Sequence, residues 1–217
     1  MTVRKLPPDM MREIIDILRD KAPLEQLVPY LDDWRCKALA LHIADMEKSI
    51  ESLDNLLNPR IRGPIPRLNE FQLALVYQAY YRSRRDRIIK AIDELMGRAI
   101  IILSDLTKAS SAVYAPYEEA GTMPFEDMSK TIQESLRDVE QAMTALSFEP
   151  LDYDQVLKAA SSLASNWDQL KLYLTQNLLN PLKMSLREEA KRRCIELLRP
   201  PPPQPPIEEV PPYVPPS

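Results

Sequence analysis

Residues 36–57, CKALALHIADMEKSIESLDNLL, carry the clearest pattern in the chain. Apolar side chains recur here at alternating spacings of three and four residues: Cys36, Leu39, Ile43, Met46, Ile50, Leu53 and Leu57. This spacing lines one face of an α-helix with the heptad periodicity of helices that pack side by side. Asn58-Pro59 ends the pattern, because proline lacks the backbone donor and clashes with the preceding turn. We therefore predict a long helix that packs against other helices.

Further stretches have the same helical character. Helices are predicted over residues 9–21, 24–31, 68–107 and 125–149, from 152 or 154 onward, and from 181 to 198. Their expected inward positions are Ile88, Ile92, Leu95, Ala99, Ile102 and Leu106, then Met128, Ile132, Leu136, Val139, Met143 and Leu146, and then Val156, Ala160, Leu163, Trp167, Leu170 and Leu174. Asp152 or Asp154 is a good N-cap for the fifth helix. Asn180-Pro181 is interpreted as an N-cap followed by a first-turn proline, which would start a separate last helix.

The first half of the longest predicted helix differs from its second half. Four apolar residues of the first half are Leu68, Phe71, Leu75 and Ala79. At about 100° per residue they lie at least a third of a turn away from the later seam, and the apolar stripe shifts near Arg82. Either the helix bends there, or it is packed between neighbours on two sides.

The composition favours a folded helical protein. Of the 217 residues, 45% are hydrophobic and 28% charged, and only 3 are glycine. Asn-Gly and Asp-Gly pairs do not occur, so hairpin turns are not indicated. We predict an all-α fold: an elongated bundle of about six helices with heptad-type seams over residues 1–199. A division near the 108–124 loop is possible, and a proline-rich tail follows over residues 200–217.

Residue types that carry catalysis or bind metals are sparse. His42 is the only histidine, and it falls beside the first seam, as a boundary residue would. Cys36 and Cys194 are far apart in sequence, which does not fit a zinc site. Three isolated glycines do not form a phosphate-binding loop. We expect no catalytic site, no metal and no cofactor, and we do not expect an enzyme.

Targeting features are also lacking in the sequence. The first residues, MTVRKLPPDMM, contain prolines and an aspartate where a signal peptide needs an apolar core. The longest wholly apolar run, residues 99–103, is far shorter than the roughly 20 residues that span a bilayer. We expect a protein that is not secreted, has no membrane span, and is located in the cytoplasm or in a virion.

Basic residues gather between Arg60 and Lys90, against a net charge of −4 for the whole chain. Candidate nucleic-acid-binding residues in and beside this stretch are Arg60, Arg62, Arg67, Tyr77, Tyr80, Arg82, Arg84, Arg85 and Arg87. Interleaved arginines and aromatic rings suit phosphates and bases. In the alternative interpretation, Tyr77 and Tyr81 continue the core, and the arginines pair with the acidic residues of 109–149.

Ten of the last eighteen residues are proline, so residues 200–217 are expected to form extended polyproline II. The candidate partner-binding residues are Arg199, Pro202, Pro205, Ile207, Val210, Tyr213 and Val214. Arg199 and the prolines fit the basic-x-x-P-x-x-P pattern that docks on aromatic grooves, although a proline-rich stretch matches this pattern easily. The alternative is a solvated spacer.

Residues 77–95, YQAYYRSRRDRIIKAIDEL, resemble the long helix of GINS-type replication subunits. The resemblance covers less than a third of the chain. It implies a replication subunit with a small β-domain, whereas this sequence predicts two more helices in that place. We do not assign the family on this resemblance.

Two functions follow from these patterns. The first is a non-catalytic structural subunit of an ordered complex, such as a virion coat or nucleocapsid-like protein, that binds other copies of itself or other subunits through its tail. The second is a helical adaptor in nucleic-acid machinery, in replication or packaging. This adaptor would bind DNA through the Arg60–Lys90 stretch and a protein through the tail.

Overall fold

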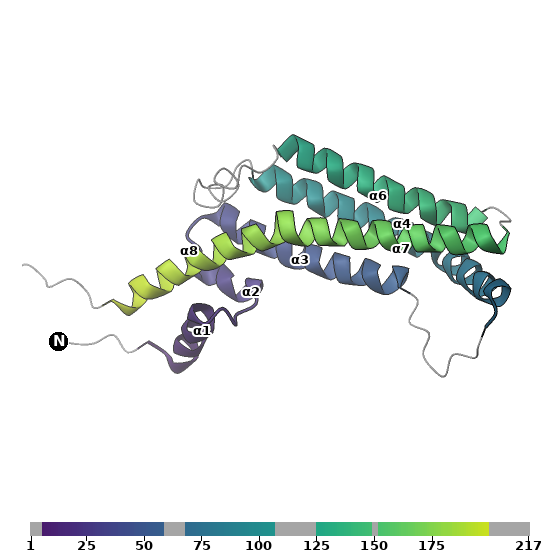
Figure 1. Cartoon of the computed structure of the whole chain (residues 1–217). Helices are drawn as coiled ribbons and strands as arrows, with labels where there is room; N and C mark the ends of the chain where they lie inside the picture. The colour runs from purple at the N-terminus through teal and green to yellow at the C-terminus, as the bar shows by residue number, and fades with distance from the viewer. Residues whose placement is uncertain (1–5, 59–67, 107–124, 149–151, 200–217) are drawn as a thin grey trace, which may run out of the picture.

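The computed structural model describes residues 6–58, 68–106, 125–148 and 152–199, and in these ranges the regular structure is helical (Figure 1). The elements are α1 (Pro8–Leu18), α2 (Leu24–Leu27), a 3₁₀ turn η1 (Val28–Tyr30), α3 (Trp34–Leu57), α4 (Glu70–Leu106), α6 (Phe125–Phe148), α7 (Tyr153–Tyr173), a π-helical turn η2 (Leu174–Leu179) and α8 (Asn180–Leu198). The predicted all-α fold is confirmed. The predicted 108–124 loop and the tail after Arg199 lie outside the described residues.

The long helices pack side by side as an elongated bundle. α4 contacts α3, α6 and α7, and α6 also packs along α7 (Figure 1). Every position predicted to face inward on α3, the second half of α4, α6 and α7 is at most 9% exposed. These side chains join those of α1 and α8 in one core cluster. Heptad spacing therefore identified the buried faces of these helices correctly, because burial of one stripe is what makes an amphipathic helix stable.

The predicted break at Asn180-Pro181 is wrong. Asn180 has helical backbone angles (φ −62°, ψ −46°), and α7, η2 and α8 form one continuous rod (Figure 1). A proline inside an α-helix removes one hydrogen bond and collides with the carbonyl four residues earlier. The π-helical turn directly before Pro181 changes that spacing, so the helix accommodates the proline without ending. Asp152, in contrast, caps α7 as expected, with its Oδ1 accepting from the Gln155 N–H at 2.8 Å.

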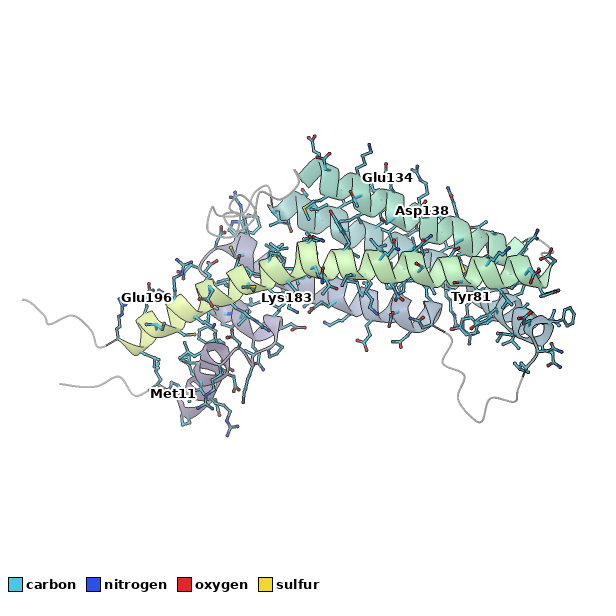
Figure 2. The ribbon with its side chains drawn as sticks, viewed as in Figure 1. Met11, Tyr81, Glu134, Asp138, Lys183 and Glu196 are labelled. Atoms are coloured by element: carbon cyan, nitrogen blue, oxygen red, sulfur yellow. The ribbon has the colours of Figure 1, made fainter. Side chains whose placement is uncertain are left out.

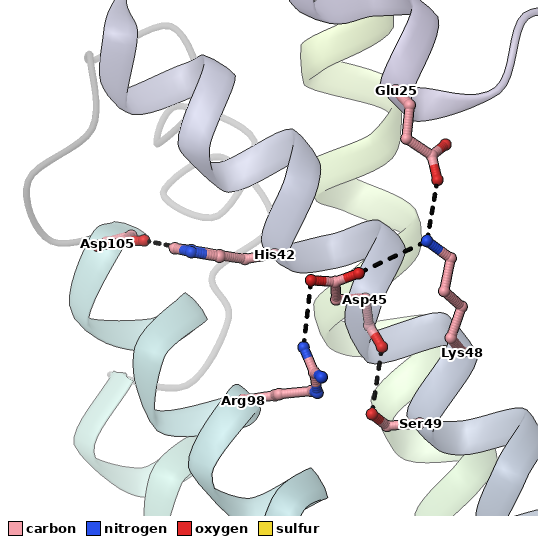
Figure 3. A network of polar contacts seen from close by, with 7 residues as sticks. All are labelled: Glu25, His42, Asp45, Lys48, Ser49, Arg98 and Asp105. Carbon is pink, nitrogen blue, oxygen red and sulfur yellow. Dashed lines mark hydrogen bonds and ion pairs between the residues drawn. The ribbon is translucent and has the colours of Figure 1, made fainter.

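A polar network joins α3 to its neighbours at the end where α1 and α2 lie (Figure 3). His42 Nδ1 lies 2.8 Å from Asp105 Oδ2 near the end of α4. One turn along α3, Asp45 pairs with Arg98 of α4 at 3.3 Å. Lys48 reaches Glu25 of α2, also at 3.3 Å. His42 thus lies at the edge of the buried seam of α3, as its sequence position indicated. Its contact with Asp105 helps to fix the register between α3 and α4.

Candidate partner-binding surface at the start of α4

The first half of α4 brings together the described members of the predicted nucleic-acid site. Tyr77, Tyr80, Arg82, Arg84, Arg85 and Arg87 occupy successive turns of this helix. Arg60, Arg62 and Arg67 lie outside the described residues, as do the tail residues Pro202, Pro205, Ile207, Val210, Tyr213 and Val214. Arg199 is described, and it is an exposed residue at the end of α8. Figure 2 labels Tyr81 and Glu196 at opposite ends of the bundle, so this part of α4 lies far from the end of α8.

The start of α4 is locally well defined. The Asn69 side chain accepts from the Gln72 N–H at 2.8 Å, and the Gln72 side chain accepts from the Asn69 N–H at 3.1 Å. This reciprocal pair is a capping box, which satisfies two backbone donors that the helix itself leaves unpaired. The helix therefore begins in an ordered way although its first turns carry exposed side chains.

The tyrosines of this region serve the fold. Tyr80 and Tyr81 donate from their hydroxyls to the carbonyls of Leu56 and Leu57, at 3.0 and 2.9 Å, and so satisfy the last turn of α3. Burial, together with the neighbouring tyrosines, raises the pKa of Tyr81, which is only 2% exposed. Tyr77 is half-buried and stacks on Tyr81 with ring centroids 6.3 Å apart. Their burial supports the interpretation that Tyr77 and Tyr81 continue the core.

One face of the Tyr80 ring is already in contact with an arginine. The Arg84 guanidinium carbon lies 4.1 Å from its ring centroid, in a cation–π contact. A base that stacked on this side of the ring would have to displace the guanidinium. The surface is thus better suited to an acidic or apolar ligand than to a stacked base.

The arginines make two kinds of contact. Arg82 Nε donates to the carbonyl of Ser147 at 3.0 Å, at the last turn of α6, where a cation is favoured by the helix dipole. Arg85 Nη1 pairs with Asp86 Oδ1, also at 3.0 Å. The acidic helix α6 therefore contributes a backbone carbonyl to this region. The interpretation that its carboxylates bind the arginines stays a prediction.

An open groove of about 610 Å³ lies beside these arginines. It is lined by Arg82, Ser83, Arg85, Asp86, Arg87 and Ser147. Three guanidinium groups and one carboxylate make the groove net positive. Its chemistry suits the carboxylates or phosphates of a ligand, which arginine binds with two parallel hydrogen bonds.

An exposed apolar face precedes the groove. On this face Phe71 and Leu75 are 58% and 51% exposed, and Val76, about 100° further around the helix, is 42% exposed. At about 100° per residue, Phe71, Leu75 and Arg82 lie within about 40° of one another around the helix. Arg82 of α4 bonds to Ser147, in the last turn of α6, so α6 ends beside Arg82. The turns of α4 that precede Arg82 therefore project past the end of α6. The shift of the apolar stripe near Arg82 was the sequence signal for this face, but it did not identify the face as a binding surface.

Neither a membrane span nor a metal site is found within the described residues. In those ranges no helix combines the length and apolar character that crossing a membrane requires. The same part of the chain brings no three histidine, cysteine or carboxylate side chains together in a way that could hold a metal ion.

The fold and the surface define this chain as an elongated all-α bundle with an arginine-lined, partly apolar surface at one end. Comparison of the chain with protein-family models, with curated proteins and with solved structures gave no match.

Proposed function

We propose that this chain is a non-catalytic structural subunit of an ordered assembly, of the kind that builds virion coats or nucleocapsids. The exposed side chains of Phe71 and Leu75, which share one face of α4 among the described residues, carry the proposal. Large apolar side chains gathered on one helix face lose contact with water when another chain covers them, which favours association.

The opposite end of the molecule has apolar side chains of its own. Met10, Met11 and Ile15 of α1 are 36–39% exposed, and Ile195 and Leu198 of α8 are 45% and 42% exposed. α1 packs on α8, so these residues belong to one end of the bundle (Figure 1). A bundle with an apolar area at each end can join copies end to end, which generates rings or filaments.

Sedimentation velocity tests the proposal directly. The sedimentation coefficient of the full chain should rise with concentration, and Leu75→Asp should suppress this rise, because burying an unpaired carboxylate opposes association. Leu172→Asp is the matched control, since Leu172 is 56% exposed on α7, away from the α4 face. A full chain that stays monomeric at every concentration would rule out self-assembly.

The tail provides a second test of assembly. Deleting the residues after Arg199 should leave helix content and the thermal midpoint nearly unchanged, because the described core is closed by side chains before that point. Self-assembly should weaken if the tail holds a neighbour. Identical assembly of the shortened and full chains would make the tail a spacer, and unfolding of the shortened chain would place the tail in the core.

The second candidate is a helical adaptor in nucleic-acid machinery. The net-positive groove of Arg82, Arg85 and Arg87 favours it, because phosphates are bound by such clusters. The engaged ring of Tyr80 and the buried Tyr81 favour the assembly function over it.

A further inference from the structure

We propose that the proline-rich segment 200–217 of one copy docks on the α4 surface of a second copy. This surface comprises the apolar residues Phe71 and Leu75 and the groove of Arg82, Arg85 and Arg87. The inference rests on the proposed assembly function and identifies the site that the tail occupies.

Charge complementarity selects this partner. The segment contains Glu208 and Glu209 and no lysine or arginine, whereas residues 70–90 of α4 contain five basic and two acidic residues. The groove adds three guanidinium groups against the single carboxylate of Asp86. Docking therefore brings two carboxylates of the segment to a surface with excess positive charge, which strengthens and orients the contact.

The apolar residues are complementary as well. Ile207, Val210, Tyr213 and Val214 lie on either side of the two glutamates or close after them. Phe71 and Leu75 are exposed just before the arginine groove along α4. A proline-rich segment loses little chain entropy on docking, and aromatic side chains such as Phe71 are the usual platforms for proline rings.

The chain's own tail cannot reach this surface. The rod of α7, η2 and α8 contains the 46 residues from Tyr153 to Leu198, so at 1.5 Å per residue it is about 69 Å long. Arg82 lies at its far end, beside Ser147 and the start of α7, while the tail leaves from Arg199 (Figure 1). Val214 lies 15 residues beyond Arg199 and can be at most about 54 Å away from it. The occupant must therefore be supplied by another copy.

Two cations near the end of α8 already have acidic partners. At the end of α8, Lys191 contacts Asp20 and Glu188 at 2.9 Å, and Arg193 contacts Asp32 and Glu196 at 3.4 and 3.2 Å. Docking of Glu208 and Glu209 there would have to compete with these carboxylates. Each of these two cations has two acidic partners, whereas the α4 groove has one carboxylate beside three guanidinium groups, which favours the groove as the site for the segment.

Disulfide trapping between two full-length variants tests the site. A chain with Leu75→Cys is mixed with a differently tagged chain with Val210→Cys under mild oxidation. The native Cys36 and Cys194 are 0% exposed and should not interfere. Docking raises the effective concentration of the two thiols, so the cross-linked heterodimer should form about tenfold more than with Leu172→Cys in place of Leu75→Cys.

Charge reversal gives an independent readout. Arg87→Glu in the chain with Leu75→Cys should reduce the amount of trapped heterodimer. Glu208→Arg with Glu209→Arg in the chain with Val210→Cys should reduce it as well. Mixing these two charge-reversed chains should restore the heterodimer, because the opposite charges face each other again. Equal trapping at Leu75 and Leu172 would overturn the site.

The failure of this site is distinguishable from the failure of assembly itself. If the full chain sediments as a concentration-dependent assembly but Leu75 and Val210 do not cross-link preferentially, the site is wrong and the assembly function stands. If the full chain is monomeric and gives no heterodimer, both are wrong. If the α4 arginines bind DNA and the cross-link is missing, the nucleic-acid function replaces the docking site.

Discussion

Trp167 Nε1 on α7 donates a hydrogen bond of 2.8 Å to Asp54 Oδ1 on α3, across 113 residues of sequence. The same carboxylate oxygen accepts from Lys171 Nζ at 2.8 Å and from Asn58 Nδ2 at 3.0 Å. Trp167 is 0% exposed, so its N–H depends on this partner. Asp54 therefore links the end of α3 to the C-terminal part of α7, and it makes the indole of a core residue compatible with burial.

Replacing Asp54 should destabilise the fold. Asp54→Ala leaves the buried Trp167 N–H without its acceptor and Lys171 without its counter-ion, so we expect a loss of about 2–4 kcal/mol in the free energy of unfolding. Urea denaturation followed by far-UV circular dichroism measures this loss. The matched control is Asp168→Ala, an exposed acid next to Trp167 in sequence, which should cost less than about 0.5 kcal/mol. Equal losses in the two variants would show that the carboxylate of Asp54 does not support the indole.

The contribution of Asp54 should depend on pH. Burial would raise the pKa of Asp54, but hydrogen bonds from Lys171, Trp167 and Asn58 outweigh burial and hold the pKa below its ordinary value of 3.8. A group whose pKa is lowered in the folded state contributes stability above its unfolded pKa and loses this contribution as pH falls through the folded pKa. The stability difference between the wild type and Asp54→Asn should therefore be constant near neutral pH and shrink below about pH 4. A difference that grew on acidification would contradict the direction of the shift.

The α3 seam should not tolerate charge. Ile50 is 9% exposed among the apolar side chains of α3 and its neighbours, and Ile50→Asp should cost several kcal/mol, on the order of 3–5, because the carboxylate would be buried without a partner. Thermal unfolding followed by circular dichroism provides the measurement. Leu41→Asp, at a 44% exposed position on the same helix, should have a much smaller effect. An unchanged midpoint for Ile50→Asp would mean that this face of α3 is not a packing seam.

The nucleic-acid alternative depends on the arginines of α4. Replacing Arg84, Arg85 and Arg87 with Gln leaves Arg82 at the end of α6 and should weaken any DNA binding. The slope of log K against log salt should then flatten by about 0.9 for each phosphate that the variant no longer neutralises. Three exposed cations elsewhere, replaced together as Lys130→Gln, Arg137→Gln and Lys158→Gln, provide a charge-matched control. If the wild-type chain binds no DNA at low salt in fluorescence anisotropy, the adaptor function is excluded.

The buried face of each long helix follows from the spacing of its apolar residues along the sequence. The predicted inward positions of α3, α6 and α7 are all buried, and so are those in the second half of α4. This information is local, because the spacing of apolar residues along a helix sets a direction around that helix whatever it packs against. The N-cap Asp152 was predictable for the same reason, since its partner is only three residues away.

How these faces meet depends on contacts between helices that are distant in sequence. The continuity of α7 with α8 through Pro181 depends on a π-helical turn, which the dipeptide Asn180-Pro181 does not reveal. The capping of α3 by Tyr80 and Tyr81 depends on where α4 crosses the end of α3. These contacts join residues far apart in the chain, so they follow from the register between helices, which periodicity within one helix does not specify.

The candidate surface was only partly visible in the sequence. The sequence located the arginines and the shift of the apolar stripe near Arg82, but it offered a bend or two neighbouring helices as the explanation. In the described residues α6 ends beside Arg82, and Phe71 and Leu75 of α4 stay exposed. The length of one helix relative to its neighbour decides this exposure, because a side chain is buried only where another element extends far enough to cover it.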